Sequence, residues 1–160
     1  SMSDRVAVMS EGKIQQMSTP NELYKNPQNI FVSDFIGETN FLKANTELNE
    51  GDYINVNIEN LGSFKIKNNL NIRENTSDVI CSVRPETMMI DKEKSDWDIC
   101  LEGKIKQTSY LGEMTKFYVE TKEIKKIITV SSQYFDNQSF QDSKCFISIN
   151  LNDISLLNKK

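Results

Sequence analysis

The chain has 160 residues, and its 19 basic and 23 acidic side chains give a net charge of −4. This length suffices for one domain with its own core, and an acidic chain without a long basic block argues against nucleic acid as a partner. No apolar run reaches the roughly 18 to 20 residues that cross a bilayer, and residues 1–5 do not resemble a secretion signal. The sequence therefore predicts a soluble, cytoplasmic protein.

The sequence contains no histidine. This composition removes nucleophiles activated by histidine and zinc sites built on imidazole. Cys81, Cys100 and Cys145 are an odd number and form no CxxC pair, so we expect free, mostly buried thiols. We predict no catalytic residue, no cofactor site and no metal site within these residues.

The first predicted elements are a β-hairpin and a short helix. Residues 6–9 and 13–17 are two strand-like runs joined by a turn that contains Gly12. Thr19-Pro20-Asn21-Glu22 then supplies an N-cap, a proline at the first helical position and an acidic residue in the first turn. This pattern predicts a helix over residues 20–26, which Pro27 ends.

A second short helix is predicted after Asn29, which can serve as its N-cap. Apolar residues follow at helical spacing, and Gly37 is expected to end the helix in the left-handed conformation. The pattern changes after this point, so we place a domain boundary between residues 38 and 39.

Residues 39–160 predict a mainly β domain. Short alternating or apolar runs are separated by turns rich in Asn, Ser and Gly, which is typical of a barrel or sandwich. The predicted strands are 52–58, 63–67, 79–83, 87–91, 98–109, 116–121, 127–131, 145–149 and 154–157.

A weak internal echo relates residues 82–90 to residues 148–156, because both read as strand, turn and strand in the same register. Two matching apolar positions can arise by chance. The alternative is that two related half-units pack together.

Several motifs, in order, resemble the segment that follows the nucleotide-binding core in the ATPase subunits of ABC importers. They are the hairpin, Thr19-Pro20-Asn21-Glu22-Leu23-Tyr24, Asn26-Pro27, Phe35-Ile36-Gly37, Asn40-Phe41-Leu42, Arg84-Pro85-Glu86 and Tyr110-Leu111-Gly112-Glu113-Met114-Thr115. The resemblance implies that residues 1–38 are the end of an ATPase domain. It implies that residues 39–160 form an oligonucleotide/oligosaccharide-binding-like (OB-like) regulatory barrel of the TOBE type.

Within this family, Phe35-Ile36-Gly37-Glu38-Thr39-Asn40 is most similar to the linker of spermidine/putrescine importers. Maltose, iron and sulfate importers share most of the same scaffold. The resemblance therefore implies a polyamine importer without excluding these other substrates.

The phosphate-binding pattern GxxxxGK[ST] does not occur in residues 1–160. We expect the chain to be a fragment that neither binds nor hydrolyses ATP, whereas its parent would use ATP and magnesium. The resemblance further implies a homodimer, a missing ATPase domain, membrane permease subunits as partners of the parent, and a place on the cytoplasmic face of the membrane. Residues 4–36 are expected to be loosely held, exchanged between chains, or folded back on the barrel.

Five residues are candidates for an interface or regulatory role. Arg84 and Glu86 flank a proline that fixes the turn, and both charges would project from it to another subunit or pair with each other. Tyr110, Leu111 and Gly112 would expose an aromatic group beside a glycine, where a partner could approach, or Gly112 would only permit a bulge. A free-standing module that binds a small oxyanion is the alternative to an importer domain.

Overall fold

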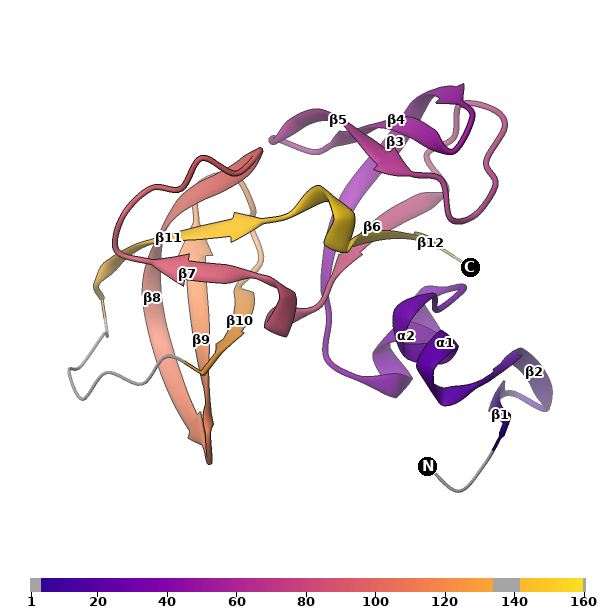
Figure 1. The fold of residues 1–160 in the computed structure, drawn as a ribbon, viewed down its shortest axis with the longest axis horizontal. Helices are drawn as coiled ribbons and strands as arrows, with labels where there is room; N and C mark the ends of the chain where they lie inside the picture. Colours follow the sequence, from indigo (N-terminus) through magenta and orange to yellow (C-terminus); the bar gives the residue numbers. More distant parts are fainter. Residues whose placement is uncertain (1–3, 134–141, 160) are drawn as a thin grey trace.

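The computed structural model describes residues 4–133 and 142–159, and it consists of a small helical segment beside two curved β sheets (Figure 1). We use the term helical segment for residues 4–36. It contains the strands β1 (Val6–Ser10) and β2 (Lys13–Ser18), followed by the helices α1 (Pro20–Lys25) and α2 (Ile30–Ile36).

The predicted N-caps start both helices. The side-chain oxygen of Thr19 accepts a hydrogen bond from the amide of Glu22 at 3.2 Å, and that of Asn29 accepts one from the amide of Val32 at 2.9 Å. These bonds satisfy backbone donors that have no partner within a helix. Each helix is too short to be stable alone, so the helical segment depends on the surface beside it.

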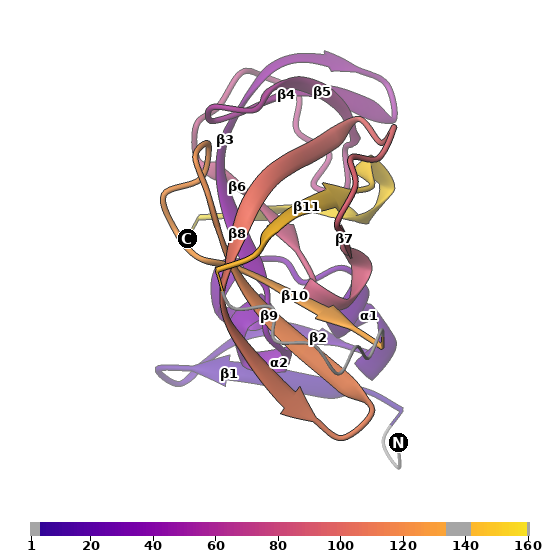
Figure 2. The same ribbon diagram turned by 90° about the vertical axis from the view of Figure 1, so that its left-hand side faces the viewer.

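The two sheets have five strands each and are antiparallel throughout. The first has the order β5-β4-β3-β6-β12, and the second has the order β10-β9-β8-β11-β7. Figure 2 shows that the hairpin of β8 and β9 extends away from β4 and β5. The strands are β3 (Asn40–Glu50), β4 (Tyr53–Ile58), β5 (Gly62–Lys67), β6 (Val79–Val83), β7 (Met89–Asp91), β8 (Ile99–Leu111), β9 (Met114–Thr121), β10 (Ile128–Ser132), β11 (Lys144–Ile149) and β12 (Ile154–Asn158).

The two sheets repeat one plan. Strands β3 to β6 occupy the same places in the first sheet as β8 to β11 occupy in the second. Both long strands, β3 and β8, carry an irregularity in their pairing with the next strand. The last strand of each sheet comes from the other half, because β6 crosses through the 3-10 helix η1 (Pro85–Thr87) to β7, and β11 crosses through η2 (Leu151–Asp153) to β12. The echo in the sequence corresponds to these two crossings, which confirms two related half-units.

One face of each sheet contributes to a shared core. The alternation predicted for β4 is confirmed, since Ile54, Val56 and Ile58 are buried in this core. The helical segment has a separate small cluster of Val8, Leu23 and Val32. The division into residues 1–38 and 39–160 stays a prediction, although one cluster lies on each side of it. Within the described ranges, no helix has the length and apolar character of a membrane span.

Three expectations from the sequence are wrong in detail. Gly37 ends α2 with an extended φ of −178°, because Arg84, rather than a left-handed turn, contacts the carbonyl groups there. Strand β3 was missed, because two of its inward-facing positions, Asn40 and Thr46, are polar. The strand expected over residues 87–91 is shorter, because η1 occupies its start.

Gly103 in β8 lies where a side chain does not fit. A Cβ atom at this position would lie 2.5 Å from Cγ1 of Val119 and 3.0 Å from the carbonyl oxygen of Glu120. We therefore expect Gly103→Ala to lower the free energy of unfolding by about 2 kcal/mol, as overpacking does. The measurement is urea denaturation followed by circular dichroism.

Gly37→Ala is the matched control for this substitution. A Cβ atom there would meet Arg84 at an ordinary 3.5 Å, and the backbone is extended, so we expect a change within about 0.5 kcal/mol. Equal losses for the two variants would contradict the close approach of β8 and β9 at Gly103.

Candidate functional site at the linker

Arg84 connects the helical segment to the first sheet. It directly follows β6, and its side chain is directed toward the ends of both helices rather than into solvent. Its Nη1 atom donates hydrogen bonds to the carbonyl oxygens of Ser33 at 3.1 Å, Gly37 at 2.8 Å and Glu38 at 3.2 Å, and Nη2 donates to that of Tyr24 at 3.4 Å. The residue is only 8 % exposed.

The chemistry of the helix ends explains this contact. The last carbonyl groups of a helix have no partner within it, and they carry a partial negative charge that favours a cation. Helix α2 has no basic residue in its own last turn, so Arg84 supplies that cation from elsewhere in the sequence. The guanidinium also lies 4.7 Å from the ring centroid of Tyr24 in α1, a cation–π contact.

Burial lowers the pKa of Arg84, and the nearby charge of Asp34 raises it in part. A guanidinium stays protonated under such shifts. The positive charge is therefore permanent at the place where the helical segment, residues 37–39 and the two sheets meet, which we call the junction.

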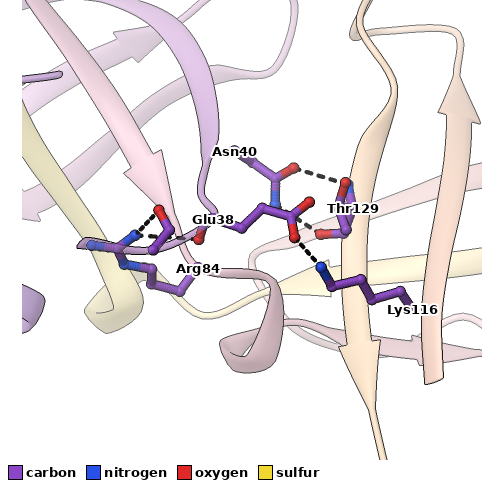
Figure 3. A network of polar contacts seen from close by, with 6 residues as sticks. Glu38, Asn40, Arg84, Lys116 and Thr129 are labelled. Carbon is purple, nitrogen blue, oxygen red and sulfur yellow. Dashed lines mark hydrogen bonds and ion pairs between the residues drawn. The ribbon is translucent and has the colours of Figure 1, made fainter. Parts of the chain in front are cut away.

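We use the term linker for residues 37–39, between α2 and β3. Asn40, at the start of β3, connects the linker to the second sheet (Figure 3). Its side-chain Nδ2 donates to the carbonyl of Thr129 at 2.9 Å, and its Oδ1 accepts from the amide of Thr129 at the same distance. Thr129 lies on β10, an edge strand whose other side pairs with β9. The side chain of Asn40 thus satisfies the outward-facing backbone groups of this edge as another strand would.

Glu38 and Lys116 form a second link between the linker and the second sheet (Figure 3). The hydrogen bond from Lys116 to Glu38 raises the pKa of the ammonium group. Both side chains are partly exposed, so the pair contributes little stability and mainly adds a directional contact.

The C-terminal strand contacts the helical segment as well. The amide of Asn158 in β12 donates to the carbonyl of Gln28 at 3.1 Å, and Asn29 forms an isolated parallel bridge with Asn158. Residues 28 and 29 therefore cover the free edge of β12 at its last residue, Asn158. Of the three arrangements expected for residues 4–36, the structure has the one folded back on the barrel.

The candidate residues lie in two separate places. Glu86 is exposed at η1, as expected, whereas Arg84 is buried beside it and contacts carbonyl groups instead of Glu86. Tyr110 and Leu111, each 53 % exposed, lie with Gly112 at the end of the β8–β9 hairpin, away from the helical segment (Figure 1). Gly112 has φ of 65° and lies in the two-residue turn between paired Leu111 and Met114, so it does not form a bulge.

Sequence reasoning missed most of the junction. Asn40 enters the sequence analysis only through the family resemblance. Lys116 and Thr129 have no local signal, because their partners lie 78 and 89 residues away. A polar residue that occupies an inward position of a strand, as Asn40 does, is the one signal that indicates a buried hydrogen-bonding role.

The thiols are free within the described part of the chain. Burial raises the pKa of Cys81 to about 12 and that of Cys145 to about 11, so both thiols stay protonated. Burial also raises the pKa of Cys100, but hydrogen bonds with Ser148 and Ser95 outweigh it and lower the value overall.

Comparison with known proteins agrees with this architecture. Residues 81–148 match the TOBE domain family. The spermidine/putrescine import ATP-binding protein PotA of Trichormus variabilis is 36 % identical over 122 residues, which is 75 % of this chain and 32 % of that protein. PotA of Thermotoga maritima is 31 % identical over 96 % of this chain and 43 % of its own length.

Two further similarities broaden the comparison. The Fe(3+) ions import ATP-binding protein FbpC of Fusobacterium nucleatum is 29 % identical over 97 % of this chain and 40 % of its own length. The fold is similar to that of the cytoplasmic molybdate-binding protein ModG, with a TM-score of 0.57 and 10 % identity over 76 % of this chain and 96 % of ModG. The predicted mainly β, OB-like fold is thereby confirmed.

The fold and the match over residues 81–148 define a TOBE-type β domain. The curated relatives, which are ABC importer ATP-binding subunits, support the same assignment, because this chain is similar to their TOBE-type regions. The chain spans 32 to 43 % of the length of the three relatives described.

Proposed function

We propose that the chain is the regulatory and dimerisation domain of an ABC importer's ATP-binding subunit, and that the whole subunit couples ATP hydrolysis to substrate import. The observation that carries this proposal is the junction, where Arg84 holds the ends of both helices and Asn40 holds the second sheet. A movement of the helical segment would be passed to both sheets through these contacts. The domain itself would have no catalytic residue, and ATP and magnesium would bind elsewhere in the subunit.

We further propose spermidine and putrescine as the imported substrates. The support is that the two PotA relatives are named for spermidine and putrescine import. Iron is the alternative substrate, because the relative FbpC is named for Fe(3+) import. Uptake assays with labelled spermidine and labelled iron would decide between the two substrates.

The proposed partners are a second copy of the chain, the ATPase domain and, through the whole subunit, membrane permease subunits. The whole subunit would lie on the cytoplasmic face of the membrane. Nucleic acid is not among them, because the chain is acidic overall. A dimer contact that persists while the ATPase domains separate would keep their effective concentration high for reassociation.

Sedimentation equilibrium tests the dimer. We expect a symmetric homodimer at micromolar concentration, and we expect Leu111→Asp at the hairpin end to raise the dissociation constant about tenfold or more. Ile127→Asp, at a position of similar exposure, 47 % against 53 %, is the control and should leave the constant unchanged. A wild-type monomer at high micromolar concentration would contradict the proposal.

A free-standing module that binds a small oxyanion is the second candidate. Its support is the similarity in fold to ModG, which is described as molybdate-binding. Calorimetry with molybdate and sulfate, and with the polycation spermidine as the contrasting ligand, distinguishes the two functions, because a scaffold domain should bind neither oxyanion.

A further inference from the structure

A cavity of about 380 Å³ lies between the helical segment and the first sheet. Its walls come from the end of α1, from η1, from η2 and from the end of β5. Figure 1 shows α1 beside β6 and β12, the two strands that provide its floor. None of the roles described above uses this cavity as a binding site.

The charges that line the cavity are mainly positive. Lys25, Lys67 and Arg84 are cations, whereas Asp153 is the only acid among the described residues that line it. Neither lysine forms an ion pair with another described residue. Arg84 bonds only to neutral carbonyl groups, so its charge is not neutralised by direct contact with a carboxylate.

The floor has hydrogen-bonding capacity that the protein does not use. Ser82 in β6 is 5 % exposed, and its hydroxyl has no hydrogen-bond partner among the described residues. In the described ranges, the polar side-chain atoms that are fully buried and have no partner are Ser33 Oγ and Glu123 Oε2. The hydroxyl of Ser82 is not one of them. The hydroxyl of Ser82 is therefore accessible, and the residue lines this cavity.

Ser155 lies directly opposite Ser82 in the pairing of β12 with β6 and lines the same floor. The side-chain hydroxyl of Thr87 donates to the carbonyl of Arg84 at 2.7 Å, which leaves its oxygen able to accept a hydrogen bond. Hydroxyl groups beside cations are the usual environment for a phosphate group, because each hydroxyl can donate to an anionic oxygen.

We propose that this cavity binds a small phosphorylated molecule that carries hydroxyl groups. The phosphate would lie among Lys25, Lys67 and the serine hydroxyls, and Asp153 would accept a hydrogen bond from a ligand hydroxyl. The volume is in the range of small-molecule sites. Because the walls belong both to α1 and to the sheet, the ligand would hold these two parts together. Binding at this cavity requires neither a dimer nor a transport role.

Amide chemical shifts of the ¹⁵N-labelled chain test the proposal, with glucose 6-phosphate as the probe, glucose as its uncharged match, and inorganic phosphate and spermidine as further probes. We expect glucose 6-phosphate at millimolar concentration to shift amides of α1, η1 and η2, and glucose to shift none of them. Inorganic phosphate should bind more weakly than glucose 6-phosphate, because it makes no contact with Asp153 through a hydroxyl.

Three variants complete this test. We expect Lys67→Gln to weaken glucose 6-phosphate binding about tenfold, the loss of one charged hydrogen bond, and Ser82→Ala to weaken it severalfold while the fold is kept. Lys92→Gln, which removes the same charge from the exposed loop after β7, should leave binding unchanged. Equal binding by the Lys67 and Lys92 variants, equal shifts with glucose, equal affinity for inorganic phosphate, or preferential binding of spermidine would each overturn the proposal.

Discussion

Replacing Arg84 by alanine is expected to release the helical segment from the two sheets and to lower the free energy of unfolding by about 3 kcal/mol. The reason is that four carbonyl groups, at the end of α1 and from Ser33 to Glu38, lose a charged donor. The carbonyl of Ser33 keeps the amide of Gly37 as a partner, and buried acceptors that keep none are costly. Thermal and urea denaturation measure the loss. Amide hydrogen exchange locates it, because protection should fall in α2 and stay unchanged in β8 and β9.

Arg84→Lys separates charge from geometry. A lysine keeps the positive charge but has no planar fork that can reach several carbonyl groups at once, so we expect it to restore less than half of the lost stability. If Arg84→Ala lowers protection equally in the helices and in both sheets, Arg84 supports the barrel as a whole and the proposed junction is wrong.

Replacing Asn40 by alanine is expected to cost about 3 kcal/mol as well, because the amide and the carbonyl of Thr129 both lose their partner at a buried site. Urea denaturation measures this cost. Increased hydrogen exchange at Thr129 would show that the edge of β10 is the part affected.

Asn45→Ala is the control for Asn40, since Asn45 lies on the same strand and is exposed. A change within about 0.5 kcal/mol is expected there. Asn40→Asp keeps the acceptor but loses the donor and should be as harmful as alanine. Similar losses for the variants at positions 40 and 45 would show that the paired hydrogen bonds contribute nothing beyond strand propensity.

Local chemistry made the helical segment predictable. Thr19 and Asn29 are strong N-caps, and both have the hydrogen bonds expected of them. The turn at Gly12 has a positive φ of 76°, as a hairpin turn needs. Such signals depend on residues three or four positions apart, so a single sequence contains them.

The strands were predictable where alternation separates apolar from polar side chains, as in β4. In β3 the same alternation exists, but it places Asn40 and Thr46 inward. A search for alternating apolar residues does not detect such a strand, because these two inward residues are polar. Both residues are buried because they bond to distant backbone groups, Thr129 for Asn40 and Thr76 for Thr46. The missed strand and the missed junction therefore have the same cause.

The pairing of the two halves had only a faint trace in the sequence. The crossings through η1 and η2 share strand register but few residues, because the geometry needs only an extended arm on each side of a short turn. The two halves also share a contact that leaves no pattern in the sequence. The side chain of Asn69 bonds to both backbone groups of Leu156 in β12, as that of Asn40 does to Thr129 in β10. An asparagine thus covers the backbone of an edge strand in each sheet, and no sequence pattern identifies such a pair.

The central claim is that the linker joins the helical segment and both sheets into one body that can transmit movement. Residual dipolar couplings of the backbone amides in α1, α2 and the two sheets test it most directly, when all are measured in one alignment medium. A single alignment tensor that fits every element is the predicted result. A separate tensor of smaller magnitude for the helical segment would show that this segment moves independently of the sheets, and it would contradict the account.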